Sequence, residues 1–478
     1  MTDKHEIRPV DERRTAGDSD SVVASDASHE DKTGRKRFVF IMFLVCLFDF
    51  ADRSVFAVLA QTIKVELRLS DLQIGLLQGL AFALLYSAFG LPLARLAERY
   101  SRRKIIAACT AFWSLSTIWC GAAHNFIHLA IGRAGVGVGE AGFLPAANSM
   151  VGDMFPRNRR ASVMSLIMLG TPLGILSGAL IGGHVASIAG WREAFFALGV
   201  PGIITAGLVW FFVNEPQRGK ADGIASQSKQ AVPDFKAFLG VLRRNKALLF
   251  IIFGGACAGF GMTSISQFLA VFLARVHELD VRDAARYYGM ISATFLALGL
   301  LIGSHVTDWL SKFDLRWPAW GASLGLAIAP FIFWAALETT DLRAATALLI
   351  IGGTSMLLFY APTSGMIQNL LEPRMRATGI ACFTLCYTLI GSGLGPAFVG
   401  FVSDQAAARH FYGDFFGICP GGVAPTGAAA AVISACAEAS ALGVKRALQT
   451  VLLAFFVASF SYFMASREMQ SQLQAERN

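Results

Sequence analysis

Charged residues are scarce in this chain of 478 residues: Asp, Glu, Lys and Arg make up 15% of it, whereas hydrophobic residues make up 54%. An average soluble domain is about 25% charged. The length alone would suggest about three soluble domains, but these would have too few charges to cover their surfaces. The composition therefore excludes a soluble enzyme or a DNA-binding protein. The net charge of +8 is expected on cytoplasmic loops, and no nucleic-acid partner is expected.

The chain also lacks the signatures of several kinds of chemistry. It contains no Gly-x-x-x-x-Gly-Lys-Ser/Thr string, which argues against ATP as the energy source. The run Gly135-Val-Gly137-Val-Gly139 lies within an apolar stretch and follows no strand, so it does not predict a nucleotide site. The histidines are isolated and predict no metal site. No nucleophile constellation indicates an enzyme, and no cofactor is expected.

Long apolar runs dominate the rest of the sequence. A membrane-spanning helix needs about 20 mostly apolar residues. Twelve such runs are present, at residues 38–62, 71–97, 103–122, 126–154, 160–189, 192–214, 247–274, 283–310, 317–337, 341–370, 375–404 and 443–466. Residues 1–37 are polar and lack the hydrophobic segment of a signal peptide, so they predict a disordered tail. The expected fold class is an all-α integral membrane protein with twelve transmembrane helices.

Basic residues gather in alternate loops. They are frequent between runs 2 and 3, 4 and 5, and 6 and 7, and absent from the short loop between runs 3 and 4. Cytoplasmic loops carry an excess of Lys and Arg, so both termini, including a short tail at 467–478, are predicted to be cytoplasmic. The linker 215–246 leads into an amphipathic stretch, Phe235 to Leu249, which is either a helix on the membrane surface or a solvated connection.

The sequence repeats itself once. The matching residues are Pro156 and Pro373, Arg159 and Arg376, and Glu98 and Asp308, separated by 210 to 217 positions. The repeat divides the chain into two six-helix halves, 38–214 and 247–466, and the second half carries an Ala/Gly-rich insertion at 406–442. Parallel repeats of this kind are typical of transporters that bind substrate between the halves near the middle of the membrane.

The basic loops also contain acids that suggest a mechanical role. A carboxylate at a helix end, facing arginines across a short loop, can clamp neighbouring helices in one conformation and release them in another. The candidate residues of such a cytoplasmic gate are Glu98, Arg99, Arg102, Arg103, Arg159, Asp308 and Arg376. The recurrence of the string in both halves favours a gate, and the alternative is positive-inside charge alone.

One of these loops, Ala94-Arg-Leu-Ala-Glu98-Arg99-Tyr-Ser101-Arg102-Arg103-Lys104, resembles the loop signature of the major facilitator superfamily, Gly-x-x-x-Asp-Arg-x-Gly-Arg-Arg. It departs from that signature where Ala94 and Ser101 replace glycines and where Glu98 replaces aspartate. The twelve runs, the repeat of six helices and the long central linker extend the resemblance over most of the chain. The resemblance implies the major facilitator fold.

Five charged residues lie inside the first and fourth apolar runs: Asp49, Asp52, Arg53, Arg133 and Glu140. An ionised group at the bilayer centre costs at least ~2.5–3.5 kcal/mol on insertion scales, so these groups are expected to pair or to line a wet cavity. Asp49 and Arg53 share one helix face, and so do Arg133 and Glu140. The sequence predicts a network between the two helices, with Asp52 and Glu140 against Arg53 and Arg133.

This network has two interpretations. It is either a static ion-pair cluster, which would stabilise the fold less than apolar packing does, or a proton-coupling site. In the second case a carboxylate takes up a proton near neutral pH and frees its arginine partner. A freed arginine can also bind the phosphate or carboxylate of an anionic substrate. Proton coupling is the favoured interpretation.

The same stretches carry a narrower resemblance. Phe48-Asp49-Phe50-Ala51-Asp52-Arg53 resembles the Asp-Arg pair in the first helix of spinster-type transporters. Gly132-Arg133-Ala-Gly135-Val-Gly137-Val-Gly139-Glu140-Ala141, followed by Pro145-Ala-Ala-Asn148, is similar to the fourth helix of that family. Family relatives export sphingosine-1-phosphate or lysophospholipids.

The resemblance to spinster proteins implies a bacterial homologue that moves a lipid-like amphiphile and is powered by a proton gradient. The expected location is the bacterial inner membrane, and a monomer is expected. It implies that Asp52 and Glu140, with Asp49 beside them, are the proton sites. It also implies that Arg53 and Arg133 are their charge partners. The resemblance does not determine the substrate.

Polar residues of the seventh and tenth runs are expected to line the other side of the cavity. They are Ser264, Ser266, Gln267, Tyr360, Thr363 and Ser364. The second half has no counterpart of the buried charges, so its side of the cavity is expected to be more apolar. A cavity with one charged and one apolar side would suit an amphiphile. In the insertion, Cys419 and Cys436 are candidates for a disulfide, because that side of the membrane would be oxidising.

Three classes of function remain open. The first is a proton-coupled exporter of a lipid-like amphiphile. The second is the same scaffold with a small organic anion, a sugar or a drug as its cargo. The third is a channel, a receptor or an integral-membrane enzyme, against which the internal repeat argues.

Overall fold

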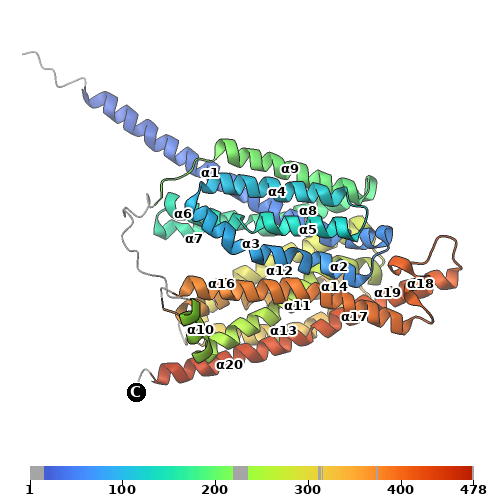
Figure 1. Cartoon of the computed structure of the whole chain (residues 1–478). Helices are drawn as coiled ribbons and strands as arrows, with labels where there is room; N and C mark the ends of the chain where they lie inside the picture. The colour runs from blue at the N-terminus through green and yellow to red at the C-terminus, as the bar shows by residue number, and fades with distance from the viewer. Residues whose placement is uncertain (1–15, 219–234, 311–313, 315, 373–374, 476–478) are drawn as a thin grey trace, which may run out of the picture.

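Every regular element among the described residues is a helix, and the helices run along one common axis in a bundle (Figure 1). The computed structural model describes residues 16–218, 235–310, 314, 316–372 and 375–475. The first half contains α1 (Ala16–Leu67), α2 (Asp71–Gln78), α3 (Leu80–Arg99), α4 (Arg102–Gly121), α5 (Phe126–Glu140), α6 (Phe143–Met154), α7 (Arg157–Met168), α8 (Gly170–Ile188) and α9 (Trp191–Phe212).

The second half follows the linker helix α10 (Phe235–Arg244). It contains α11 (Lys246–Val276), α12 (Val281–Leu310), α13 (Trp317–Glu338), α14 (Leu342–Leu357), α15 (Tyr360–Asn369), α16 (Arg376–Cys386), the π-helix η3 (Tyr387–Leu394), α17 (Gly395–His410), α18 (Phe415–Ile418), the 3₁₀ helix η4 (Pro420–Gly422), α19 (Ala430–Val451) and α20 (Leu453–Ala475). Polar side chains begin several of these helices, as at α2, where Ser70 and Gln73 form a reciprocal capping box.

Several helices continue one another after a short break, and grouping them gives the twelve membrane-crossing segments that the sequence predicts. The combined segments are α2–α3, α5–α6, α7–α8, α14–α15, α16–η3–α17 and α19–α20; the single ones are α1, α4, α9, α11, α12 and α13. Over the described residues, nine segments are long and apolar enough to cross a membrane by composition alone. The other three are α1, α4 and α5–α6, and two of these carry the five buried charges.

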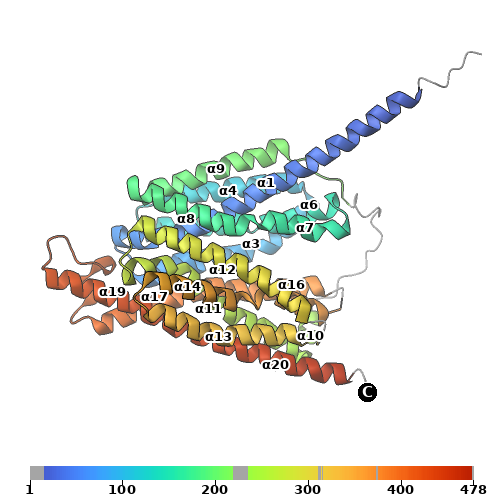
Figure 2. The same cartoon turned by 180° about the vertical axis from the view of Figure 1, so that it is seen from behind.

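Helix α1 begins at Ala16, within the segment 1–37 whose composition predicts a disordered tail. The first part of α1 projects beyond the bundle (Figures 1 and 2). Its polar composition explains why it does not join the packed core. No proline interrupts it between Ala16 and the membrane segment, so the helix of that segment continues outward. Residues 1–15 lie outside the described residues.

The insertion at 406–442 is more ordered than an Ala/Gly-rich loop. Helix α17 extends to His410, and the twelfth membrane segment begins early, so that Ala430–Met469 forms one stretch of 40 residues. Alanine is the strongest helix former, which explains why the Ala-rich part from Ala430 is helical. Between these helices, Cys419 and Cys436 are joined by a disulfide with a Cα–Cα distance of 5.8 Å.

The two ends of the bundle differ in what they carry. The start of α1, the end of α20 and the linker helix α10 lie at one end, which we call the tail end (Figures 1 and 2). Helices α2, α18 and the start of α19 lie at the other, which we call the insertion end. Helix α10 occupies most of the predicted amphipathic stretch and buries Phe238 against the second half, while Arg243 and Arg244 are exposed.

The two halves are joined most closely toward the insertion end. One cluster of buried apolar residues contains members of both halves, such as Leu59 and Leu77 with Phe268 and Phe272. A second cluster consists of first-half residues alone, such as Val151. Apolar packing therefore connects the halves on the side of α2 and leaves a separate first-half core toward the tail end.

Helices α2 and α17 touch backbone to backbone at this junction. A Cβ atom on Gly75 would lie 2.2 Å from the carbonyl oxygen of Pro396, and one on Gly400 would lie 2.1 Å from that of Asp71. No side chain fits at either distance, and backbone atoms cannot move aside as the tip of a side chain can. Glycine at both positions is what lets the two halves meet here.

We expect Gly75→Ala to lower the thermal unfolding midpoint of the purified protein in detergent. Overpacking of this kind costs about 1–3 kcal/mol. The matched control is Gly90→Ala in α3, where a Cβ meets nothing within 4 Å and where alanine should stabilise the helix by about 0.5–1 kcal/mol. Equal midpoints for the two variants would show that the close approach at Gly75 is not a constraint.

Candidate functional site

Arg53 forms the centre of a charge cluster in the middle of the first half. Its Nη2 lies 2.6 Å and its Nε 2.7 Å from Oε2 of Glu140, and its Nε lies 3.3 Å from Oδ1 of Asp49. Helices α1 and α5 supply these side chains, as predicted from their spacing. The carboxylates of Asp49 and Glu140 are buried, whereas the Arg53 side chain is 29% exposed. One guanidinium thus neutralises two carboxylates from two helices.

Asp52 is held differently from the prediction. Its Oδ2 accepts a hydrogen bond of 2.8 Å from the hydroxyl of Thr117 in α4. No described ion pair involves Asp52, so the predicted pairing with an arginine is not formed in this structure. Thr117 was missed in the sequence because a lone threonine in an apolar helix gives no signal of its partner.

Arg133 is buried without a carboxylate partner among the described ion pairs. Its Nε donates to the carbonyl oxygen of Leu77, at the long distance of 3.4 Å. Its guanidinium lies 4.8 Å from the ring centre of Phe56 and 5.5 Å from that of Phe82. Aromatic faces attract a cation that has left water. Arg133 therefore retains most of its five donors for another acceptor.

Several polar atoms of the cluster have no hydrogen-bond partner among the residues that the structure describes. They include Oδ1 of Asp52 and Oε1 of Glu140, both of which are buried. A buried polar atom without a partner is costly unless water or a proton satisfies it. Each of these oxygens is a position where a carboxyl proton or a water molecule would be stabilised.

Three aromatic side chains of the second half, Tyr360, Phe383 and Tyr387, form a group that we call the aromatic wall. The ring centre of Tyr360 is 5.9 Å from that of Tyr387. Phe383 extends this wall, with its ring 5.9 Å from that of Tyr387. On the first-half side, the ring of Tyr86 lies 5.6 Å from the Arg53 guanidinium. Tyr360 was predicted as a lining residue, whereas Tyr86, Phe383 and Tyr387 were not.

Two of the predicted lining residues turn away from the other half. Thr363 is fully buried, and its hydroxyl lies 2.6 Å from that of Tyr462 in α20, inside the second half. Ser264 is fully buried beside Gly395 of α17. Ser266, Gln267 and Ser364 are half-buried. The carbonyl of Gln267 accepts from Nε2 of Gln78 across the junction of the halves.

At the tail end, Arg102 forms a clamp within the first half. Its Nε lies 2.8 Å from Oε1 of Glu215, its Nη1 bonds Asp153 and donates to Ser149 at 2.9 Å, and its Nη2 donates to the Pro216 carbonyl at 2.9 Å. The Arg102 side chain is 1% exposed. It therefore ties the start of α4 to α6 and to the chain after α9.

The other predicted clamp residues are placed differently. Glu98 and Arg99 are exposed, and no described hydrogen bond or ion pair involves their side chains. Arg103 donates to the Val213 carbonyl at 3.3 Å. Arg159 is exposed, and the side chain of Asp308 lies outside the described residues. The acids of the clamp are thus Asp153 and Glu215 rather than Glu98.

The repeat at the tail end is shifted by one residue from the predicted alignment. Nε of Arg160 donates to the carbonyl of Phe155 at 2.9 Å, and Nε of Arg376 donates to the carbonyl of Leu371 at 3.3 Å. Each arginine caps the carbonyl five residues before it. Arg376 therefore corresponds to Arg160 and not to Arg159, which sequence matching on the preceding proline could not distinguish.

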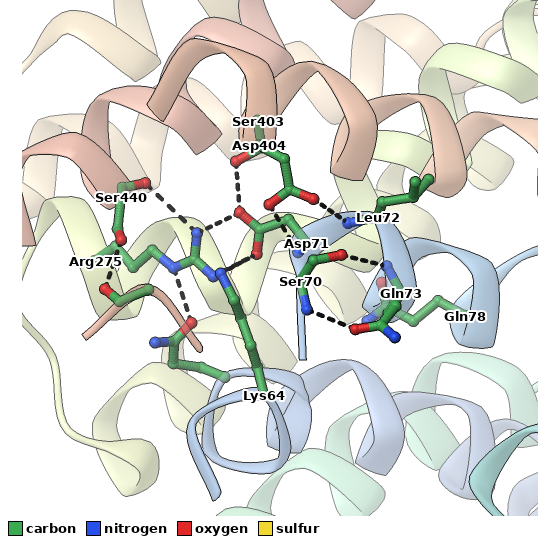
Figure 3. Close-up of polar contacts among 12 residues, drawn as sticks. Lys64, Ser70, Asp71, Leu72, Gln73, Gln78, Arg275, Ser403, Asp404 and Ser440 are labelled. Atoms are coloured by element: carbon green, nitrogen blue, oxygen red, sulfur yellow. Dashed lines mark hydrogen bonds and ion pairs between the residues drawn. The ribbon is translucent and has the colours of Figure 1, made fainter. Parts of the chain in front are cut away.

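A second buried charge cluster, at the insertion end, was not predicted as a site. It consists of Lys64, Asp71, Arg275 and Asp404 from four helices (Figure 3). Lys64 lies at the end of α1 and Arg275 at the end of α11. Basic residues are common at helix ends, so neither residue indicates a site in the sequence. The two aspartates lie near the ends of apolar runs, and only the fold reveals that all four residues meet.

Burial raises the pKa of Glu215, but hydrogen bonds from the Arg103 backbone N–H, the Arg102 guanidinium and the Ser101 hydroxyl outweigh it and bring the pKa below 4.5. We expect Glu215→Gln to destabilise the protein by about 1–2 kcal/mol at pH 7, because the buried arginine loses one of its two acids. Since the folded pKa lies below the unfolded value, this contribution is present above pH 4.5 and is lost as pH falls through the folded pKa.

Thermal unfolding in detergent at pH 7 and pH 4 measures this effect, with the exposed Glu98→Gln as the control. The difference in unfolding midpoint between the parent protein and Glu215→Gln should be smaller at pH 4 than at pH 7. Glu98→Gln should have the same midpoint as the parent protein at pH 7. The assignment of the clamp would be contradicted if the difference in midpoint were unchanged at pH 4, or if Glu98→Gln lowered the midpoint as much as Glu215→Gln does.

Comparison with known proteins gives the same architecture. A solved bacterial homologue of the human lysosomal transporter Spinster, in an inward-facing and unoccupied conformation, is similar with a TM-score of 0.82 and 30% identity, covering 92% of this chain and 98% of that one. An MFS-type efflux pump of Mycolicibacterium smegmatis is 32% identical over 391 residues, 80% of this chain and 88% of that protein. The sphingosine-1-phosphate transporter SPNS2 of Xenopus tropicalis is 26% identical over 380 residues, 74% of this chain and 71% of that protein.

The predicted resemblance to spinster proteins is confirmed by these relatives. The sequence model of the Major Facilitator Superfamily matches residues 41–396, which is most of the chain. Twelve membrane-crossing segments in two halves, with a buried charge cluster in the middle, agree with that match. The chain belongs to the Major Facilitator Superfamily and is a secondary transporter with many membrane-spanning helices.

Proposed function

We propose that the protein is a proton-coupled exporter of lipid-like amphiphiles that works by alternating access of its two halves, residues 38–214 and 247–466. The observation that carries the proposal is the bridge from Arg53 to Glu140 and Asp49 in the middle of the membrane. A bilayer penalises each of these charges. A cluster that only stabilised the fold would be less effective than apolar packing, which favours a working role.

Protonation of Glu140 would change what Arg53 binds. The shortest ion pair of the cluster loses its negative charge, and Arg53 then has Asp49 as its remaining acid. The link between α1 and α5 weakens, while the link within α1 persists. One proton moving down about 100 mV supplies about 2.3 kcal/mol, and one pH unit adds about 1.36 kcal/mol. Asp52, with one oxygen unpaired, is the second candidate for the proton.

Arg133 is the proposed contact for the substrate head group. A planar guanidinium with free donors binds phosphate or carboxylate through two parallel hydrogen bonds. The aromatic residues Tyr360, Phe383 and Tyr387 offer an apolar surface on the other side for an acyl or sphingoid chain. Similarity to a sphingosine-1-phosphate transporter and to a spinster homologue supports this substrate class.

The proposed orientation places the tail end in the cytoplasm of a bacterium and the insertion end outside its inner membrane. The basic loops at the tail end support it through the positive-inside tendency. The disulfide at the insertion end supports it too, because disulfides persist in an oxidising compartment. We propose that the protein acts as a monomer.

A small organic anion is the alternative cargo, and Arg133 favours it as much as a lipid. The anionic group of the small molecule would bind the same guanidinium, but the molecule would have no chain to contact the aromatic wall. Proteoliposomes with an imposed pH gradient distinguish the two. Uptake of labelled lysophospholipid, blocked by other lysolipids, supports the lipid proposal. The absence of both uptake and competition by any lysolipid would overturn it.

We expect the double variant Asp52→Asn and Glu140→Gln to lose pH-driven transport, down to the level of empty liposomes. Amides keep the shape of the carboxyl groups but cannot take up a proton at neutral pH. The measurement is initial uptake with and without a pH gradient, alongside thermal unfolding to verify the fold. The control is Glu193→Gln, an exposed acid in the first turn of α9 and outside the cluster. Full gradient-driven transport in the double variant would remove the proposed coupling.

We expect Arg133→Lys to raise the apparent KM for an anionic substrate roughly tenfold, because an ammonium replaces paired hydrogen bonds with a single point of contact. The KM for a zwitterionic lysolipid should change less. Arg343→Lys, an exposed arginine in the first turn of α14, is the matched control. Equal changes in KM for the two classes of lipid would contradict a direct contact with the anionic group.

A further inference from the structure

We propose that the buried charges at the insertion end and the disulfide-closed turn above them form one gate, which holds the two halves together there and comes apart when the cavity opens on that side. The charges are those of Lys64, Asp71, Arg275 and Asp404, called the insertion-end network. The turn is the segment from Cys419 to Cys436, called the lid. The inference deepens the proposed transport cycle and rests on it for its role in that cycle.

Asp71 is the meeting point of the network (Figure 3). Its carboxylate pairs with Nζ of Lys64 and with Nη2 of Arg275, both at 2.7 Å, and accepts from the hydroxyl of Ser403 at 2.7 Å. Lys64 belongs to the first half, whereas Arg275 and Ser403 belong to the second. The side chains of Lys64, Asp71 and Arg275 are each at most 5% exposed, so these contacts are closed to solvent.

Asp404 strengthens the same junction by capping a helix of the other half. Its two carboxylate oxygens accept from the backbone N–H groups of Asp71 at 2.9 Å and Leu72 at 2.8 Å. These are orphan donors in the first turn of α2, where a negative charge is also favoured by the helix dipole. The first half therefore cannot separate from the second here without leaving the N–H groups of Asp71 and Leu72 without their carboxylate acceptor, although the Ser70–Gln73 capping box stays with α2.

Arg275 extends the junction in both directions. Its Nε donates to Oε1 of Gln61 in α1 at 2.8 Å, and its Nη1 reaches the carbonyl of Ser440 in α19 at 3.5 Å. Ser440 in turn donates from its hydroxyl to the carbonyl of Gly422 in the lid at 2.6 Å. A continuous chain of hydrogen bonds thus links α1, α11 and α19 to the lid.

The lid rests on Lys64 through two glycines. Gly421 and Gly422 have φ angles of +71° and +78°, which glycine adopts without strain. A Cβ on Gly422 would lie 2.9 Å from Nζ of Lys64. The disulfide between Cys419 and Cys436, both fully buried, fastens this turn to α19. The lid belongs to the second half, and it covers a lysine of the first.

The composition of the network suits a contact that must break. Two cations and two carboxylates balance, so neither half carries a large uncompensated charge into water on separation. A buried ion pair contributes little net stability compared with apolar packing, because water solvates the separated groups well. The geometry of the pairs is specific nonetheless. The network therefore defines one closed arrangement without making it too stable to open.

Hydrogen–deuterium exchange of the full-length protein, in nanodiscs without substrate or pH gradient, tests the gate. In Asp404→Asn, one of the two cap acceptors and the negative charge are lost. We expect amides at the start of α2 and in α17 to exchange roughly tenfold faster or more, and amides of α4 to be unchanged. The matched control is Glu66→Gln in α1, which pairs with Arg192 inside the first half at the same end.

Faster exchange of α2 and α17 in Asp404→Asn alone supports the gate. No change in Asp404→Asn, or an equal change in Glu66→Gln, would overturn it. The measurement uses no substrate and no proton gradient. A failure of lysolipid transport or of proton coupling would therefore leave its result intact, and the two proposals can fail separately.

The lid is tested by Gly422→Ala against Gly427→Ala. Both glycines have positive φ, but a Cβ on Gly427 meets nothing within 4 Å. Both variants bear the same backbone strain, and only Gly422→Ala displaces Lys64 from Asp71. We expect faster exchange at the start of α2 in Gly422→Ala only. Faster exchange confined to the lid itself, or equal behaviour of the two variants, would show that the lid is not part of the gate.

Discussion

The low dielectric of the membrane interior is the constraint on which the arrangement of charges depends. Within it an ionised side chain needs a partner of opposite charge or a set of well-placed dipoles. Arg53 has two carboxylates, Arg133 has a carbonyl oxygen and two aromatic faces, and Lys64 and Arg275 share Asp71. Each cation therefore has few acceptable positions. A protein built on such contacts moves between a small number of discrete arrangements rather than deforming gradually.

The charge clusters differ in whether they join helices of one half or of both. The clamp at Arg102 ties α4, α6 and the end of α9 together, so that the first half behaves as one body at the tail end. The insertion-end network joins α1 and α2 to α11 and α17, which belong to different halves. Rigid halves with a breakable contact between them are what rocking motion about a central site requires.

The sequence predicts the membrane segments, the two halves and the helices that carry the central charges, because hydropathy and helical spacing are local properties. It does not predict which charges pair. Spacing shows that Asp49 and Arg53 share a face of α1, but the rotation of α1 against α4 decides that Asp52 meets Thr117 instead of an arginine. Likewise, Thr363 is polar and lies on the expected helix, yet it faces Tyr462 within its own half. Pairing depends on packing between helices, which involves residues far apart in the chain.

The central cluster and the insertion-end network are connected through α2. Arg133 donates to the carbonyl of Leu77, in the last turn of the helix whose first turn Asp404 caps. Leu77 follows Asp71 by six positions, about 9 Å along the helix. In the proposed cycle, an anionic head group that binds Arg133 competes with the Leu77 carbonyl, which is held at only 3.4 Å. Substrate binding then loosens one end of α2 while the network holds the other. Helix α2 therefore has one end at the proposed substrate contact and the other at the proposed gate, which makes it the direct structural link between them.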